Sequence, residues 1–306
     1  MRPPLELALE NVPLAIVLVA CASLMFAGGA TLQQQGVSGI VDQTASNRSM
    51  SLRQMLRLLR SRVWLAGLGV SIAGGLTHIG GLTLAPVTVV QPVGVLSVPW
   101  AVLFGARISR TWPPARLWVA VGATFVGVAG FTAISTSSAV EGTWFSDLQV
   151  VAAAGVVVIF GLVLAAFGRF GAPRWRCLMW AAAGSFFYGL SSALIRVLTV
   201  LLAPGCWARP VFWAVAVIWL GGYAVGGWMV QQAYANGPAE IVVGAMTTID
   251  PIIAVSFGLT VLGEGARIGW PEGLGLVAAG GVAVLGVLSL SQHHPAAIQN
   301  RSAKSD

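Results

Sequence analysis

Long apolar runs dominate this sequence, and only short polar stretches separate them. A helix that crosses about 30 Å of hydrocarbon needs roughly 20 mostly apolar residues. Transmembrane strands would instead alternate polar and apolar positions over about ten residues, which these continuous runs do not. The pattern therefore predicts an all-α polytopic membrane protein with about nine transmembrane helices, at residues 13–33, 63–84, 87–106, 115–134, 148–167, 178–202, 211–231, 239–262 and 271–290.

Composition supports a lipid environment. Of the 306 residues, 57% are hydrophobic and 9% are charged, whereas a soluble domain carries about 25% charged residues. The chain has too few polar side chains to cover a water-facing surface. Its 38 glycines also fit, because small residues let membrane helices approach closely. Gly222 and Gly226 form one such pair, which leaves open packing within the protomer or a homodimer.

The basic residues predict the orientation of the bundle. With nine spans, thirteen of them fall on one side of the membrane, and only Arg2, Arg209 and Arg267 on the other. Basic loops stay in the cytoplasm, so we expect a multi-pass cell-membrane protein with its N-terminus outside and its C-terminus inside. Glu6 and Glu10 favour an anchored first helix over a cleaved signal peptide, whose leader is positive. The thirteen are Arg48, Arg53, Arg57, Arg60, Arg62, Arg107, Arg110, Arg116, Arg169, Arg174, Arg176, Arg301 and Lys304.

Residues 51–62, SLRQMLRLLRSR, place leucines and a methionine at helical spacing with arginines between them. This pattern predicts a short amphipathic helix on the cytoplasmic membrane surface, with a partner-binding helix as the alternative. The polar tail, residues 291–306, is expected to be disordered. The net charge of +7 is spread over separate loops, which argues against a nucleic-acid partner.

An internal repeat is the most informative pattern. Residues 84–99 read LAPVTVVQPVGVLSVP, and residues 236–251 read NGPAEIVVGAMTTIDP. Further along, GARI at 105–108 recurs at 265–268, and each copy is followed by Trp-Pro. The prolines of the two copies have the same spacing and are Pro86 with Pro99 and Pro238 with Pro251. Because the matching motifs occur in the same order in both halves, the sequence predicts a duplication.

The two copies fall on opposite sides of the membrane, which makes the repeat inverted, as in many secondary transporters. Proline inside a membrane helix kinks it. Pro99 and Pro251 are therefore predicted to kink their helices near the midplane, where such transporters bind substrate. The expected organisation is a first repeat of four spans at 1–134, an outer linker at 135–147, a second repeat of five spans at 148–290 and the tail at 291–306.

With these motifs in view, the chain resembles the drug/metabolite transporter superfamily, whose members carry EamA-type repeats. The second half is similar to that repeat at 232–239, QAYANGPA, and at 261–264, VLGE. The first half most resembles the NIPA-type magnesium transporter family, through FAGGATLQQQG at 26–36, WLAG at 64–67 and the run at 84–98. The resemblance implies a transporter, and a Glu after the proline-bearing helix is present only in the second repeat, as Glu264.

Ionisable residues within spans cost about 2.5–3.5 kcal/mol to insert and so mark functional candidates. Asp250, directly before Pro251, is the strongest candidate for carrying a proton or binding a cation, with a structural pair to Arg196 or His78 as the alternative. Arg196 could bind an anionic cargo, pair with an acid or extend to the outer interface. His78 could relay protons or bond to a neighbouring carbonyl. Further candidates for a polar path are Gln91, Gln232, Tyr234 and Asn236.

Three functions are weighed against these residues. The leading one is a secondary transporter that moves a small metabolite or amphipath by alternating access, with protons coupled through Asp250. The second is a magnesium or other divalent cation transporter, in which Asp250, Glu240 or Glu264 would supply the carboxylate oxygens that magnesium prefers. The third is a membrane-embedded enzyme or scaffold, but the sequence offers no nucleophile–base pair, metal motif or phosphate loop. We therefore expect no enzymatic activity and no cofactor, and the expected partners are the bilayer and a small-molecule or ion substrate.

Overall fold

A computed structural model describes residues 12–41, 50–82, 84, 93–138, 146–201, 209–263 and 268–293. These residues form helices and short connections, and no strand occurs among them. The helices are α1 (Val12–Ser38), α2 (Leu52–Leu58), α3 (Arg62–Leu82), α5 (Ser97–Ser109), α6 (Ala115–Ser138), α7 (Asp147–Phe170), η2 (Pro173–Trp175), α8 (Arg176–Leu201), α9 (Pro210–Asn236), α10 (Ala239–Val261) and α11 (Trp270–His293).

Eight of the described helices are long and apolar enough to cross a bilayer: α1, α3 and α6 to α11. The protein is thus an all-helical polytopic membrane protein. The remaining predicted span, 87–106, coincides only in part with α5, which begins at Ser97 and has 13 residues. At 1.5 Å per residue α5 is about 20 Å long, and the first part of that span lies outside the described residues. The count of nine therefore stays a prediction.

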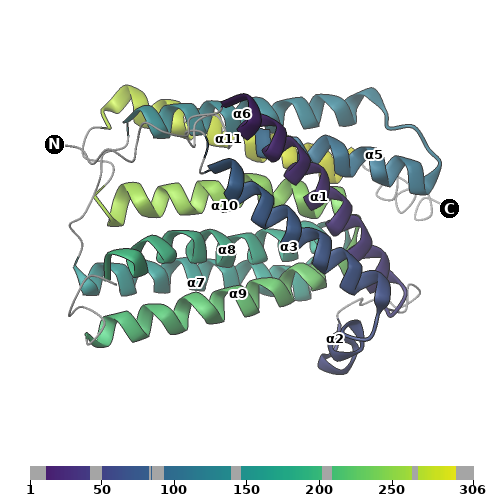
Figure 1. Ribbon diagram of the computed structural model, residues 1–306, viewed down its shortest axis with the longest axis horizontal. Helices are drawn as coiled ribbons and strands as arrows, with labels where there is room; N and C mark the ends of the chain where they lie inside the picture. The colour runs from purple at the N-terminus through teal and green to yellow at the C-terminus, as the bar shows by residue number, and fades with distance from the viewer. Residues whose placement is uncertain are drawn as a thin grey trace.

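The long helices lie side by side along the bundle axis, as Figure 1 shows. α6 packs on α11, α8 packs on α7, α9 and α10, and α1 and α3 form a pair that slants across the others. α6 continues to Ser138 and α11 to His293, several residues past their predicted ends. The polar residues that suggested a linker and a tail there are accommodated in the last helical turns.

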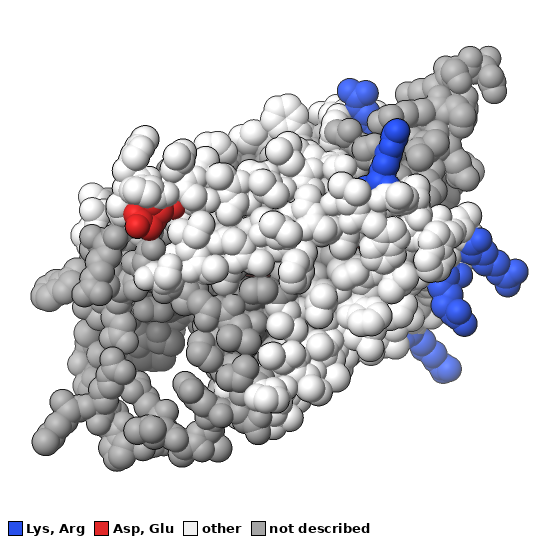
Figure 2. Space-filling view, turned by 90° about the horizontal axis from the view of Figure 1, so that it is seen from above, with Lys and Arg blue, Asp and Glu red and all other residues white. Residues whose placement is uncertain are grey.

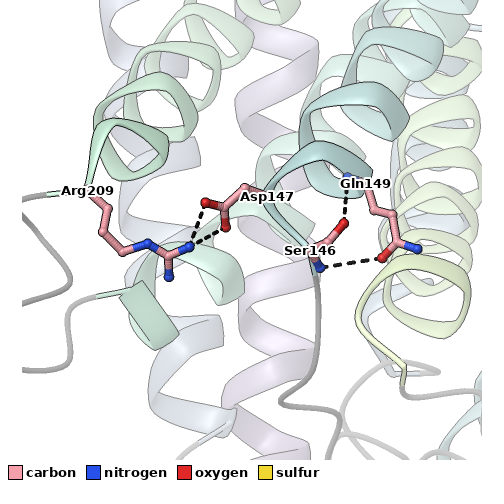
Figure 3. A network of polar contacts seen from close by, with 4 residues as sticks. All are labelled: Ser146, Asp147, Gln149 and Arg209. Carbon is pink, nitrogen blue, oxygen red and sulfur yellow. Dashed lines mark hydrogen bonds and ion pairs between the residues drawn. The ribbon is translucent and has the colours of Figure 1, made fainter.

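Charge separates the two ends of this bundle. One end, called the basic end below, carries the arginines in and around α2, the α5–α6 connection and the α7–α8 connection, and Figure 2 shows basic side chains there and acidic ones at the opposite end. At the opposite end Arg209, before α9, bonds both carboxylate oxygens of Asp147 at 2.6 Å, which ties α9 to α7 (Figure 3). Ser146 and Gln149 form a capping box that starts α7 beside this ion pair. The basic-end arginines are Arg53, Arg57, Arg60, Arg62, Arg107, Arg110, Arg116, Arg169, Arg174 and Arg176.

The glycines of α9 pack within the chain. A Cβ at Gly222 would lie 2.6 Å from the Ser191 hydroxyl, and one at Gly226 would lie 3.1 Å from the Phe187 Cβ. Both glycines thus face α8. The small-residue pair that had left a homodimer open serves the α8–α9 contact, and it carries no argument for a dimer.

The two prolines expected to kink their helices differ in position. Pro251 lies inside α10, as predicted. Pro99 is the third residue of α5, and Val95 and Leu96, directly before α5, form a turn that follows helical residues 93 and 94. The chain from 85 to 92 lies outside the described residues, so the kink at Pro99 stays a prediction. The first four N–H groups of a helix have no intrahelical partner, and a proline at this position breaks no hydrogen bond within α5.

Candidate functional site

Asp250 lies in the middle of α10 and faces α8. Its Oδ1 atom accepts a hydrogen bond from the Ser192 hydroxyl at 3.3 Å, and the residue is half-buried. The backbones meet closely at this point, because a Cβ at Gly189 would lie only 2.7 Å from the Asp250 carbonyl oxygen. Asp250 is therefore held between two helices of the second half, with Ser192 as a hydrogen-bond partner. The Arg196 side chain lies outside the described part of the chain, so a pair between Arg196 and Asp250 stays a prediction.

Backbone polarity adds to this region. Pro251 has no N–H, so the helical hydrogen bond to the Thr247 carbonyl is absent. The Thr247 hydroxyl bonds the carbonyls of Val243 at 2.8 Å and Gly244 at 3.3 Å, one turn earlier. The middle of α10 thus presents a carboxyl group beside a carbonyl that lacks its usual helical donor, in the part of the span that is otherwise apolar.

Tyrosines extend the polar region from Asp250 towards the basic end. The phenol groups of Tyr188 and Tyr223 interact electrostatically with Asp250, and their rings lie 5.7 Å apart. Tyr234, predicted as a path residue, is 4% exposed and interacts with Tyr188 and with Cys177. These groups form a polar series on α8, α9 and α10 that runs from the buried Tyr234 to the exposed Tyr223.

A buried amide network joins the two halves nearer the basic end. Gln231 of α9 accepts a hydrogen bond from the Trp64 indole at 2.9 Å and donates one to the Gln33 side-chain oxygen at 3.0 Å. Gln33 in turn donates to the Ser71 hydroxyl at 3.0 Å. Gln33, Trp64 and Gln231 are each at most 7% exposed. The network ties α1 and α3 to α9 through side chains whose polar atoms satisfy one another.

Gln232, a predicted site residue, clamps the chain beside this network. Its amide accepts a hydrogen bond from the Met50 N–H at 2.7 Å and donates one to the Met50 carbonyl at 2.9 Å. Asn236, also predicted, donates from its side chain to the Gln232 carbonyl, one turn earlier in α9, at 2.8 Å. Both residues therefore have structural partners at the end of α9.

Glu240 lies in the first turn of α10, as expected for a residue at a helix N-terminus. Its side chain is 4% exposed and presses against α5, since a Cβ at Gly105 would lie 2.6 Å from the Glu240 Oε1 atom. A cavity of about 20 Å³ lies beside it, lined also by Ser109 and Thr111, and that volume accommodates about one water molecule. α5 and α10 thus meet at the basic end around a buried carboxyl group.

Two buried hydroxyl groups mark the same seam deeper in the bundle. Ser97 at the start of α5 and Thr248 of α10 are fully buried, and neither hydroxyl has a partner among the described residues. Buried hydroxyl groups are normally bonded, and Ser97 and Thr248 therefore each offer unused hydrogen-bonding capacity on the two helices that meet at this seam.

His78 of α3 lies beside the start of α5. Its ring is 6.1 Å from the Phe26 ring, and a Cβ at Gly94 would lie 3.5 Å from the His78 Cε1 atom. Its Nδ1 atom has no partner within the described part of the chain. Arg196 lies on α8, but its side chain is outside the described part, as are Gln91 and Glu264 entirely.

A groove of about 500 Å³ opens between α6, α10 and α11. Apolar side chains such as Phe131, Ile252 and Leu276 line most of it, and Ser256 contributes a hydroxyl group. Ile252 and Ser256 line it on the side of α10 that meets α6 and α11, whereas Asp250 faces α8. The groove can hold an apolar moiety.

Sequence reasoning missed Ser192, Gln33, Trp64 and Met50. A polar residue within a predicted span was the available signal for the first two, and the Trp64 partner could not be read from any local pattern. No protein-family model, curated protein or solved structure matches the chain.

Proposed function

We propose that this protein is a secondary transporter of the drug/metabolite transporter type, in which two inverted repeats move a small metabolite or amphipath by alternating access. The observation that carries the proposal is the pairing of its helices. α1 packs on α3 and on α5, and α8 packs on α9 and on α10. If the first repeat lacks a counterpart of α7, then α1, α3, α5 and α6 correspond in order to α8, α9, α10 and α11. The contacts of α1 with α3 and α5 then correspond to the contacts of α8 with α9 and α10.

The contacts between the halves follow the same rule. If a two-fold axis in the membrane plane relates the halves, a helix that lies beside the axis contacts its own counterpart in the other half. This is what is observed: α5 packs on its counterpart α10, and α6 packs on its counterpart α11. In the second pair, Gly127 meets Ala283 and Gly286 meets Thr124. In the first contact the glycine is on α6 and its neighbour on α11, and in the second the glycine is on α11 and its neighbour on α6. The four residues lie at nearly equivalent positions of the two helices. This symmetry supports the duplication inferred from the repeated prolines.

Alternating access requires a seal that opens at one end. At the basic end the Gln33–Gln231–Trp64 network, the Gln232 clamp and the Glu240–Gly105 contact all join elements of different halves. In the proposed cycle this end is closed in the structure and parts when the cargo leaves towards the cytoplasm. The basic end faces the cytoplasm by the positive-inside rule, which places the N-terminus outside.

Asp250 is the proposed proton carrier. A carboxyl group in a span is expensive unless it is bonded or hydrated, and here it has one hydroxyl partner, Ser192, and two nearby phenol groups. The buried hydroxyl groups of Ser97 and Thr248, which have no partner among the described residues, would hydrogen-bond the polar part of the cargo. Asp250 and Glu240 engage different helices, α8 and α5, so the geometry favours a metabolite over a magnesium ion, which needs converging oxygen ligands.

Flux into proteoliposomes tests the proposal, with a panel of cations, amino acids and cationic amphipaths measured across a pH series. We expect flux of one compound class that depends on pH. Asp250→Asn should keep the thermal unfolding transition and lose the pH dependence, because an amide keeps the shape but cannot titrate. The matched control, Asp147→Asn at the opposite end, should retain it.

Two outcomes would count against this account. Unchanged pH-dependent flux in Asp250→Asn would remove the coupling role. A folded protein that transports nothing in the panel would contradict the transporter assignment.

A further inference from the structure

The short helix α2 presents three distinct faces at the basic end, where Figure 1 shows it projecting beside the start of α3. Each residue turns an α-helix by about 100°, so residues three and four apart share a face. Leu58 and Met55 lie on the face that meets the protein, and Leu58 is fully buried. The two other faces of α2 carry exposed side chains.

Leucines occupy one of the exposed faces. Leu52, Leu56 and Leu59 are spaced by four and three residues and are 74%, 57% and 56% exposed. Three leucines gathered on one side of a seven-residue helix form an apolar patch that water solvates poorly. At the edge of a membrane bundle, the acyl boundary of the bilayer is the apolar phase within reach.

Arginines occupy the face next to the leucines. Arg53 and Arg57 lie on α2 and Arg60 in the turn that follows its C-cap residue Leu59. They have the same spacing as the leucines, one position further along the chain, and all three are exposed. No acidic residue occurs from residue 50 to residue 82, so this charge is not neutralised within its own segment. The adjacent phase must supply anions.

The N-terminal end of α2 is fixed to the bundle. Its first turn carries a capping box between Ser51 and Gln54, and the preceding Met50 is clamped through its backbone by Gln232 of α9. A helix held in this way presents its faces in a constant orientation, which lowers the entropy lost on binding.

We propose that α2 is a binding element for anionic phospholipids, with the three arginines on the headgroups and the three leucines in the acyl boundary. Charge complementarity favours this occupant, because the arginines are positive and the headgroups negative. The order of the faces around the helix also fits: one face meets the protein, the next carries leucines for the hydrocarbon, and the third carries arginines for the headgroups. Lipid binding by α2 requires only that the bundle is inserted in a membrane, and it does not depend on the proposed transport function.

Lipid selectivity of the full chain in nanodiscs tests the headgroup contact. Spin-labelled phosphatidylglycerol and phosphatidylcholine are compared for association with the parent protein and with the variant Arg53→Gln/Arg57→Gln/Arg60→Gln. Each basic residue near an anionic surface contributes a factor of about five to binding. We therefore expect the preference for phosphatidylglycerol at this site to fall by up to about a hundredfold.

A control of equal charge sits at the same end. The variant Arg107→Gln/Arg110→Gln/Arg116→Gln removes three exposed arginines around the α5–α6 connection and should leave most of the preference. Equal losses in the two variants would show a general charge effect and would overturn the proposal, as would an unchanged preference in the α2 variant.

Depth measurements test the leucine face. Nitroxide labels at Leu56→Cys and at Arg57→Cys, in a chain otherwise free of cysteine, are compared for collision with oxygen and with a water-soluble nickel complex. The label at position 56 should lie among acyl chains and the label at position 57 at the headgroups. Equal exposure of both labels to water would overturn the proposal and would leave α2 available to an acidic protein.

Discussion

α1 and α8, which the proposed repeat makes equivalent, are buried to different degrees. Of the residues in the most apolar part of each span, 72% are buried in the span of α8 and 44% in the span of α1. Their neighbours α3 and α9, which the repeat also makes equivalent, are buried to similar degrees, with 17% of the residues buried in α3 and 22% in α9. The difference therefore arises on one side of α8, where α7 packs. The first half has no counterpart of α7 among its described helices, and the outer face of α1 is left for lipid.

The comparison shows what holds each helix. In lipid there is no hydrophobic force between helices, and association depends on close packing and on interhelical hydrogen bonds. α8 is held by packing on three neighbours. α1 has less packing, and Gln33 bonds it to Gln231 of α9 and to Ser71 of α3. The half with fewer helices thus relies more on polar contacts.

The largest expected effect comes from a core leucine of α8. Leu194 is fully buried, whereas Leu24 of α1 is 40% exposed. Leu194→Ala leaves a cavity and should lower the free energy of unfolding by about 2–5 kcal/mol, measured by denaturant titration in detergent. Leu24→Ala should change it by less than about 0.5 kcal/mol. Equal costs would mean that α1 is covered as fully as α8.

Glycine contacts should give the next largest effect. A Cβ at Gly67 would lie 2.7 Å from the Gln33 nitrogen and 2.8 Å from the Gly29 carbonyl, both backbone atoms that cannot rotate away. Gly67→Ala should therefore cost about 1–3 kcal/mol of folding free energy by overpacking. Gly69→Ala, with open space around it, is the matched control on α3. A Gly67→Ala protein as stable as the control would remove the α1–α3 crossing.

Breaking the amide network should have a smaller effect. Gln231→Leu leaves the buried Trp64 indole N–H and the Gln33 oxygen without their partner, at a cost of about 1–3 kcal/mol. The triple variant Gln33→Leu/Trp64→Phe/Gln231→Leu removes both partners as well and should recover most of that loss, because no polar atom of the three remains unbonded. Thermal unfolding of both proteins checks this. No recovery would show that shape, and not bonding, holds α1 to α9.

The smallest effect is expected at the ion pair that ties α7 to α9. Arg209 and Asp147 are 47% and 44% exposed, and exposed pairs contribute about 0–1 kcal/mol because solvent screens them. A double-mutant cycle with Arg209→Gln and Asp147→Asn should give a coupling in that range that shrinks as salt is raised. A larger, salt-independent coupling would make this pair a main anchor of α7.

The helices were predictable because each apolar run is long enough to satisfy its backbone in lipid without any partner. The turn at Val95 and Leu96 before α5 was not predictable, because the sequence around Pro99 is as apolar as a full span. The basic end was also predictable, since arginines are costly within the hydrocarbon and basic loops stay on the cytoplasmic side.

The partners within the bundle were less predictable. Asp250 stood out as an acid in an apolar run, but Ser192 did not. Serines in helices commonly bond their own backbone, as Ser185 and Ser191 do with the carbonyls of Ala181 and Phe187. Partner choice depends on how helices are registered against one another, which the local pattern does not encode.

Distances across both ends of the bundle test the central claim, that the two halves move against each other. Spin labels at Ser109 and Arg174 span the basic end, and labels at Ser137 and Trp213 span the opposite end; all four sites are exposed. On acidification, or on addition of a compound transported in the flux assay, the basic-end distance should lengthen while the opposite-end distance shortens. Distances that stay fixed, or that change together in one direction, would contradict alternating access.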